Sequence, residues 1–168
     1  MTHLYICRHG ESVLNAQRTY AGQLDTPLTD LGRQQAAAAG TSADQTFAID
    51  CIVASPLSRA LETAQIIAKK LGCPTDKIIQ NALMMERSYG SLEGQPWTIA
   101  PDPVIFSDIE TEEALIARAQ AGLDFLRSLP AQNILLVSHG SFLLALSGIV
   151  LAEPPKAELF NAQIVQLV

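Results

Sequence analysis

Short apolar runs recur along the chain, and their residue types predict β-strands. They span residues 4–7, 51–54, 78–85, 134–137 and 164–168 and are rich in branched apolar side chains. The earlier runs are apolar at consecutive positions, which is typical of strands covered on both faces. The sheet is therefore expected to be buried between two other layers.

Between these runs, apolar residues follow a helical spacing. After Ser55, they recur at positions 57, 60, 61, 64, 67, 68 and 71. Ser55 is the predicted N-cap of this helix, with Pro56 at its first helical position. Helices are predicted over residues 29–43, 56–71 and 111–129, and from Ser141 onward.

Strands that alternate with helices indicate an α/β fold. The expected architecture is a three-layer sandwich with a mostly parallel sheet, helices on both faces and ligands at the carboxyl ends of the strands. A length of 168 residues favours one domain over residues 1–168. Residues 88–110 contain three prolines and no clear period, so they predict a short loop insertion over that edge.

The charge balance limits the partners. Eleven Lys and Arg residues against seventeen Asp and Glu residues give a formal net charge of −6. An acidic chain of this kind is not expected to bind nucleic acid or an anionic membrane surface. If the ligand is an anion, the few cations must converge on one spot.

Cysteine usage and the apolar segments bear on the compartment. Cys7, Cys51 and Cys73 form no C-x-x-C pair, and no secretory leader pattern opens the chain, so a reducing, cytoplasmic setting is expected. The most apolar window, residues 134–152, is interrupted by a Ser-His-Gly-Ser sequence near its start. It therefore predicts a buried strand, a turn and a helix in place of a membrane span. The oligomeric state stays open.

Several chemistries are excluded by missing patterns. The chain has no G-x-x-x-x-G-K and no G-x-G-x-x-G sequence, which argues against an NTPase or a dinucleotide enzyme. Six positions after the three cysteines stand Val13, Leu57 and Ile79, where a cysteine-based phosphatase would need Arg. With three histidines and no H-E-x-x-H, a metal site is not expected. No cofactor is expected either, if the few cations of the chain supply the charge compensation that an anionic ligand needs.

Five polar residues are predicted to meet at the carboxyl edge of the sheet. Arg8 and His9 follow the first strand, and His139 holds the equivalent place after the run 134–137. Arg59 falls in the first turn of its helix, and Glu86 follows the run 78–85. Any one of them alone would be an ordinary surface or satisfied residue. Together they indicate one site.

The chemistry of this set favours a phosphate monoester. Two guanidinium groups can hold phosphoryl oxygens in forked contacts, and His139 adds a further donor. The helix that begins at Ser141 is expected to point its N–H groups and positive end at the same anion.

Ordered stretches of the sequence carry a family resemblance. They are Arg8-His9-Gly10-Glu11-Ser12, Asn15, Ala21-Gly22, Asp25-Thr26-Pro27-Leu28-Thr29, Gly32, Ser55-Pro56-Leu57-Ser58-Arg59-Ala60, Glu86-Arg87-Ser88-Tyr89-Gly90, Leu92-Glu93-Gly94 and Ser138-His139-Gly140. In this order the chain resembles the histidine phosphatase superfamily, also called the phosphoglycerate mutase-like family.

The resemblance implies a role for each residue of the predicted site. His9 would be the nucleophile and form a phosphohistidine, while Arg8, Arg59 and His139 would bind the phosphoryl group. Glu86 would donate a proton to the leaving oxygen and then take one from water. A hydrogen bond from the other ring N–H of His9 to a backbone carbonyl would fix its tautomer.

The resemblance also implies weaker assignments around the pocket. Asn15 and the backbone at Ala21 and Gly22 would contact the phosphoryl group or substrate, and Tyr89 would line the pocket. Each has a structural alternative, such as a turn glycine or a core aromatic residue. Trp97 is expected to pack on the domain, although it would also be able to cover the pocket.

Glu86 has two readings. As an acid it needs partial burial under the 88–110 loop to offset the guanidinium groups around it. The alternative is a plain ion pair with Arg87 or Arg59.

Two departures from the family pattern matter for function. Arg18 stands one place earlier than the corresponding family Arg, so its role in substrate binding is open. Between Arg87 and Arg118 there is no Lys or Arg, whereas phosphoglycerate mutases use basic residues in a longer insertion to hold a second anionic group.

The favoured function is a phosphatase acting on a small phosphorylated metabolite, with a phosphoprotein as a further possibility. The alternatives are a cofactor-dependent phosphoglycerate mutase and a non-catalytic phosphate-binding module.

Overall fold

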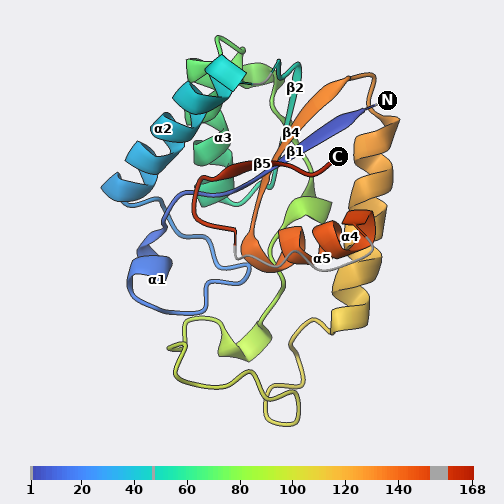
Figure 1. Ribbon diagram of the computed structural model, residues 1–168. Helices are drawn as coiled ribbons and strands as arrows, with labels where there is room; N and C mark the ends of the chain where they lie inside the picture. Colours follow the sequence, from blue (N-terminus) through green and yellow to red (C-terminus); the bar gives the residue numbers. More distant parts are fainter. Residues whose placement is uncertain (1, 47, 152–158) are drawn as a thin grey trace.

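A twisted five-stranded sheet forms the centre of the computed structural model, which describes residues 2–46, 48–151 and 159–168 (Figure 1). The strand order is β3-β2-β4-β1-β5, with β5 antiparallel to β1 and the other neighbours parallel. The strands are β1 (His3–Arg8), β2 (Cys51–Ala54), β3 (Ile79–Gln80), β4 (Asn133–Ser138) and β5 (Ile164–Gln166).

Helices cover both faces of this sheet. On one face α3 packs on the strands and α2 packs on α3, while α4 and α5 cover the other face (Figure 1). The helices are α1 (Val13–Ala16), α2 (Asp30–Thr46), α3 (Ser58–Lys70), α4 (Glu112–Ser128) and α5 (Gly140–Leu151), with short 3₁₀ turns η1 (Thr75–Lys77), η2 (Ala82–Met84) and η3 (Gly90–Leu92). The predicted α/β sandwich with a mostly parallel sheet is confirmed.

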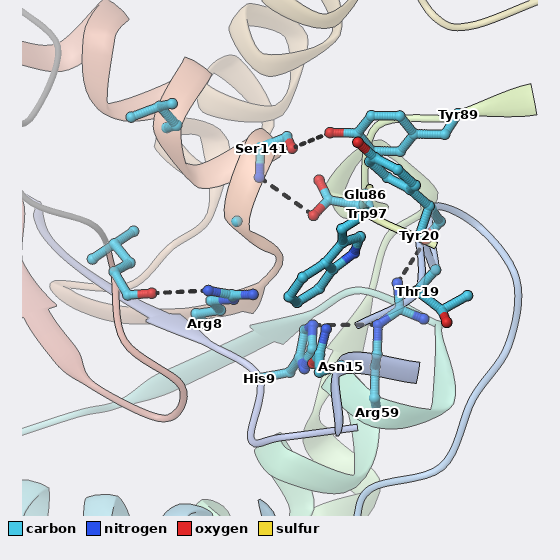
Figure 2. A pocket seen from close by; sticks show the side chains of 15 residues that line it. Arg8, His9, Asn15, Thr19, Tyr20, Arg59, Glu86, Tyr89, Trp97 and Ser141 are labelled. Atoms are coloured by element: carbon cyan, nitrogen blue, oxygen red, sulfur yellow. Dashed lines mark hydrogen bonds between the residues drawn. The ribbon is translucent and has the colours of Figure 1, made fainter. Parts of the chain in front are cut away.

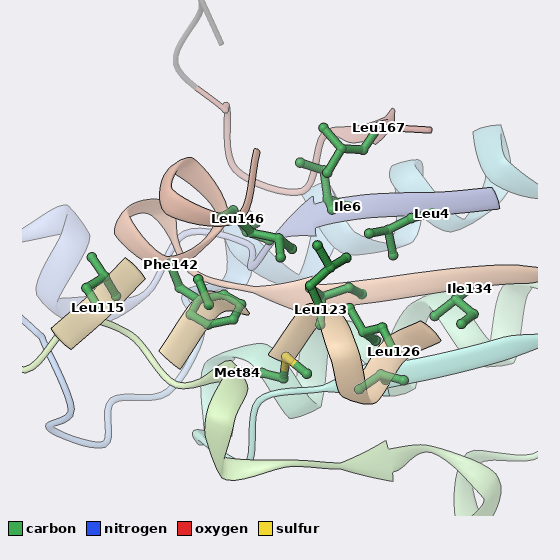
Figure 3. Packing of buried hydrophobic residues seen from close by; sticks show 14 residues of the cluster. Leu4, Ile6, Met84, Leu115, Leu123, Leu126, Ile134, Phe142, Leu146 and Leu167 are labelled. Carbon is green, nitrogen blue, oxygen red and sulfur yellow. The ribbon is translucent and has the colours of Figure 1, made fainter. Parts of the chain in front are cut away.

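The central strands divide their apolar side chains between two cores, because successive side chains in a strand point to opposite faces. From β1, Leu4 and Ile6 enter the core under α4 and α5, shown in Figure 3. Tyr5 and Cys7 enter the core under α3. Both faces of β1 and β4 are therefore buried, as consecutive apolar residues predicted.

Two local predictions are wrong. The run 78–85 forms a strand of only two residues, because the Asn81 side chain accepts a hydrogen bond from the Leu83 N–H (2.9 Å) and begins the η2 turn. The helix predicted from Pro56 begins at Ser58, with Leu57 as its N-cap and no side-chain cap. Ser55 is fully buried and contacts His139.

The predictions for the 88–110 loop and for the apolar window 134–152 agree with the structure. In residues 88–110 the only regular element is η3, and the Asp108 carboxylate holds the turn through Ser91 (2.8 and 2.9 Å). The apolar window 134–152 forms β4, a turn and α5 up to Leu151; residue 152 lies outside the described residues. Within the described ranges, no helix has the length and apolar character to cross a membrane.

Candidate active site

A cavity of about 530 Å³ opens at the carboxyl end of the central strands (Figure 2). It takes residues from the end of β1, from the loop after α1, from α3 and from the start of α5. Its walls are formed by Arg8, His9, Asn15, Thr19, Tyr20, Ala21, Gly22, Arg59, Glu86, Tyr89, Trp97, Gly140, Ser141, Leu144 and Leu159. The structure thus brings eight of the nine predicted site residues to one cavity wall; His139 is the exception.

His9 lies at the floor of the cavity with its ring in a fixed orientation. Its Nδ1 lies 2.7 Å from the carbonyl oxygen of Gly10, so Nδ1–H donates and Nε2 carries the lone pair of the ring, which accepts a hydrogen bond from Arg59 Nε (3.3 Å). Burial, with the nearby Arg59 and Arg8 guanidinium groups, lowers the pKa of His9 from 6.5 to about 3. The predicted tautomer-fixing hydrogen bond is confirmed, and the ring is neutral near pH 7.

Arg59 projects from the first turn of α3 and is 1% exposed. Its Nε lies 3.3 Å from Nε2 of His9, while its Nη atoms donate to the carbonyl oxygens of Gly22 (2.6 Å) and Leu24 (2.8 Å). The guanidinium group therefore also fixes the path of the 22–24 loop that forms one wall.

Gly22 is required by this loop. Its φ of +48° lies in the left-handed region, and a Cβ there would collide with the Glu93 carboxylate. Glu93 Oε1 accepts from the backbone N–H groups of Gln23 (2.9 Å) and Tyr89 (3.0 Å), so it joins two walls of the cavity. Gly22 is therefore more than a generic turn residue.

The Arg8–His9 backbone is held by the segment that precedes β5. The Asn161 amide donates to the carbonyl oxygen of His9 (2.8 Å), and the Ala162 N–H donates to that of Arg8 (2.8 Å). Arg8 Nη1 donates to the carbonyl oxygen of Leu159 (3.2 Å). Its Nε is buried without a hydrogen-bond partner among the described residues, which leaves a donor for a ligand.

His139 lies against His9, with ring centroids 5.1 Å apart at 61°. It is fully buried, and its Nε2 lies 2.8 Å from Ser55 Oγ, while Nδ1 has no partner in the described part of the chain. Burial and the neighbouring His9, Arg59 and Arg8 hold the pKa of His139 well below 6.5. A contact from His139 to a phosphoryl group stays a prediction.

Glu86 is partly buried at the opposite side of the cavity, above the N-terminus of α5 (Figure 2). Its Oε1 accepts from the N–H groups of Arg87 (2.8 Å) and Phe142 (3.2 Å), and Oε2 from that of Ser141 (3.3 Å). The expectation that the N–H groups at the start of α5 bind the same anion as the guanidinium groups is therefore wrong, because Glu86 occupies them. The ion pair with Arg87 or Arg59 is not formed.

Arg118 of α4 supports the segment that leads into Glu86. It donates to the carbonyl oxygens of Leu83 (2.8 Å), Met85 (2.7 Å) and Glu86 (3.2 Å), and it pairs with Glu110 (2.7 Å). Sequence reasoning missed this residue, because nothing local in a helix indicates which distant carbonyl groups it will meet.

Aromatic residues form the outer part of the cavity. The Tyr89 hydroxyl lies 3.2 Å from Ser141 Oγ, and burial raises the pKa of Tyr89. Tyr20 stacks beside Tyr89 with centroids 5.1 Å apart. Trp97 lines the cavity and is 45% exposed, so the expectation that it packs on the domain is wrong. Arg18 is exposed and does not line the cavity.

Five wall residues were missed by the sequence analysis. Thr19 and Tyr20 stand directly before Ala21, and that adjacency would have been a usable signal. Gly140 follows His139 in a stretch that carries the family resemblance, which was a usable signal as well. Leu144 and Leu159 gave no signal, since apolar residues at such positions usually enter a core.

The donor groups at the floor suit an anion. Guanidinium and imidazole nitrogens surround His9, and the Asn15 side chain keeps its NH₂ available because Oδ1 accepts from the Ser12 N–H (3.2 Å). Among the residues that the structure describes, no group of three His, Cys, Asp or Glu side chains is placed to hold a metal ion.

This fold and this floor define an enzyme of the histidine phosphatase class. The model of the histidine phosphatase superfamily (branch 1) matches residues 4–168, and the chain belongs to that superfamily.

Curated relatives carry both phosphatase and mutase names. An uncharacterized phosphatase, PhoE, of Bacillus subtilis is 37% identical over 151 residues, covering 87% of this chain and 76% of PhoE. A probable phosphoglycerate mutase, GpmB, of an Enterobacter species is 36% identical over 170 residues, covering 94% of this chain and 79% of its own.

Solved structures share the fold over nearly the whole chain. A phosphoserine phosphatase variant from Entamoeba histolytica, in complex with phosphoserine, has a TM-score of 0.81 at 28% identity, covering 99% of this chain and 90% of its own. YhfR of Bacillus stearothermophilus has a TM-score of 0.83 at 27% identity, covering 98% and 89%.

Proposed function

We propose that the protein is a phosphatase that hydrolyses small phosphate monoesters through a phosphohistidine on His9. The observation that carries the proposal is the state of the His9 ring. Its Nδ1–H is committed to Gly10, and its neutral Nε2 lies at the cavity floor beside two arginines. Nucleophilic attack on phosphorus requires an unprotonated nitrogen, and Nε2 would exchange the hydrogen bond from Arg59 for the bond to phosphorus.

In the first step, Nε2 of His9 attacks phosphorus in line with the ester oxygen. The N–P bond forms, the P–O bond to the alcohol breaks, and the departing oxygen takes a proton from the Glu86 carboxyl group. Arg8 and Arg59 balance the charge on the three remaining phosphoryl oxygens. Glu86 suits this role by position, because it lies close to the phosphoryl-binding Arg8. Both side chains approach Gly140: a Cβ added to that glycine would lie 3.7 Å from the Arg8 guanidinium and 3.9 Å from Glu86 Oε2.

In the second step, water attacks the phosphohistidine. The O–P bond forms, the N–P bond breaks, Glu86 takes a proton from the water, and His9 returns to its neutral state. The acid of the first step thus becomes the base of the second. The net reaction converts ester and water into alcohol and phosphate.

Mutase activity is the second candidate, because several relatives bear that name. A phosphoglycerate carries a carboxylate besides its phosphate, which needs a cation of its own. Among the described wall residues, the cations are Arg8 and Arg59, and both belong to the phosphoryl end. This favours hydrolysis over isomerisation.

The test compares His9→Ala with the native chain. We expect kcat/KM for p-nitrophenyl phosphate to fall at least ~10³-fold, about 4 kcal/mol of transition-state stabilisation. His3→Ala, at an exposed position, is the matched control. A rapid quench in alkali, which preserves phosphohistidine, should reveal one phosphoryl group on the peptide that contains His9. Unchanged turnover in His9→Ala would refute the proposal, and isomerisation of 3-phosphoglycerate without phosphate release would favour the mutase.

A further inference from the structure

The cavity extends well beyond the phosphoryl end. At about 530 Å³ it lies in the range of sites that enclose an organic ligand, so much of it surrounds the alcohol half of the ester. This outer part is bounded by Tyr20, Tyr89, Trp97, Leu144 and Leu159, which we call the outer wall. Figure 2 shows the Trp97 indole pointing into the cavity.

The two tyrosine hydroxyl groups of the outer wall are already engaged. The Tyr20 hydroxyl donates to the carbonyl oxygen of Ile99 (3.1 Å), and the Tyr89 hydroxyl is hydrogen-bonded to Ser141 (3.2 Å). Apart from the indole N–H of Trp97, the wall therefore offers ring faces and methyl groups to a ligand. Trp97 (45%) and Leu144 (50%) also keep exposed apolar surface that a ligand would cover.

The five residues that the structure describes in the outer wall carry no positive charge. Arg87 lies close by, because its guanidinium is 5.7 Å from the centre of the Tyr89 ring. However, its Nε donates to the carbonyl oxygen of Glu110 (2.8 Å), and it does not line the cavity. The charged group next to the wall is the Glu93 carboxylate, which accepts hydrogen bonds from the backbone N–H groups of Gln23 and Tyr89. A second anionic group on the substrate would meet no cation among the described residues of this wall.

Backbone pairing holds two of the aromatic residues as a unit. The Tyr20 N–H donates to the carbonyl oxygen of Gln95 (2.9 Å), and the Trp97 N–H donates to that of Arg18 (2.9 Å). The main chain of Trp97 is thus fixed, while its side chain is half exposed. An apolar ligand would not have to order the backbone of this wall, which reduces the entropy lost on binding.

We propose that the substrates are monoesters of uncharged alcohols that bear an aromatic or bulky apolar group, and that this group packs on the outer wall. The inference rests on the proposed phosphatase function and adds the class of the alcohol. It accounts for the wall residues that phosphoryl transfer itself does not use. It also excludes phosphoglycerate as the preferred substrate.

The experiment compares phosphate esters of three primary alkyl alcohols, so that the leaving groups have similar intrinsic reactivity. They are 2-phenylethyl phosphate, ethyl phosphate and 3-phosphoglycerate, assayed by phosphate release. We expect kcat/KM for 2-phenylethyl phosphate to exceed that of each other ester at least about tenfold, because only the phenyl group fills the apolar part of the site.

Two variants test the wall itself. Trp97→Ala and Leu144→Ala should each reduce the ratio of kcat/KM between 2-phenylethyl and ethyl phosphate by about three- to tenfold. Ile116→Ala removes a similarly exposed apolar side chain from α4, away from the cavity, and should leave the ratio unchanged. Both wall positions are half exposed, so these changes are compatible with folding.

The outcomes separate the two proposals. Hydrolysis in which ethyl phosphate or 3-phosphoglycerate equals or exceeds 2-phenylethyl phosphate overturns the inference and leaves the phosphatase function standing. A ratio unaffected by both wall variants also overturns it. Failure to hydrolyse any of the three esters or p-nitrophenyl phosphate overturns the phosphatase function, and this inference with it.

Discussion

Acidification from pH 7.5 to 5.0 should destabilise this protein through its buried histidines. His9 is 3% exposed, and its pKa is lowered from 6.5 to about 3, first by burial and then by Arg59. Between these two pH values the His9 imidazole is protonated in the unfolded chain but neutral in the folded chain. Proton binding by His9 therefore does not affect the free energy of unfolding above the unfolded pKa, and it lowers that free energy as the pH falls below it.

The magnitude follows from the two pKa values of His9. The free energy of unfolding changes by about 1.4 kcal/mol per pH unit for one proton, and pH 5.0 lies about 1.5 units below the unfolded value. His9 alone should therefore lower the free energy of unfolding by about 2 kcal/mol at pH 5.0 relative to pH 7.5. His139 is shifted in the same direction and adds to the loss.

Urea denaturation at the two pH values measures the loss. His9→Gln removes one titrating imidazole, so its loss between pH 7.5 and 5.0 should be about 2 kcal/mol smaller than that of the native chain. His3→Gln, at an exposed position, is the control and should keep the native pH dependence. Ring ¹⁵N spectra give an independent check. A native chain whose His9 ring gains its second proton above pH 5 would refute the reasoning.

Three further changes test the supports of the site. Ser55→Ala removes the hydroxyl next to His139 Nε2, and we expect kcat to fall about tenfold, with recovery in Ser55→Thr; an unchanged kcat would contradict a positioning role. Thr63→Val leaves the Gly10 N–H without its buried acceptor (3.0 Å) and should lower the free energy of unfolding by about 1–3 kcal/mol in urea titrations. In Arg118→Lys a single ammonium group cannot donate to all three backbone carbonyl groups that Arg118 binds, so kcat should fall while KM changes little. A rise in KM alone would indicate a role in substrate binding instead.

The layers of the fold and the residues at the floor of the site follow from patterns in the sequence. Consecutive apolar residues in β1 and β4 predicted strands covered on both faces, because a strand with one wet face would alternate. The placement of Arg8, His9, Arg59 and Glu86 followed from topology, since parallel strands all end at one edge of the sheet. The glycines directly after His9 and His139 belong to the stretches that carry the family resemblance.

Which polar groups form hydrogen bonds with one another follows from the packing of elements that are distant in sequence. The N–H groups at the start of α5 bind Glu86, and Ser55 contacts a histidine 84 positions away where local rules placed a helix cap. Arg118 and the outer wall likewise belong to segments distant in sequence. Periodicity reports which face of an element is buried; the partner of a buried polar atom depends on how elements pack, and no local pattern encodes that.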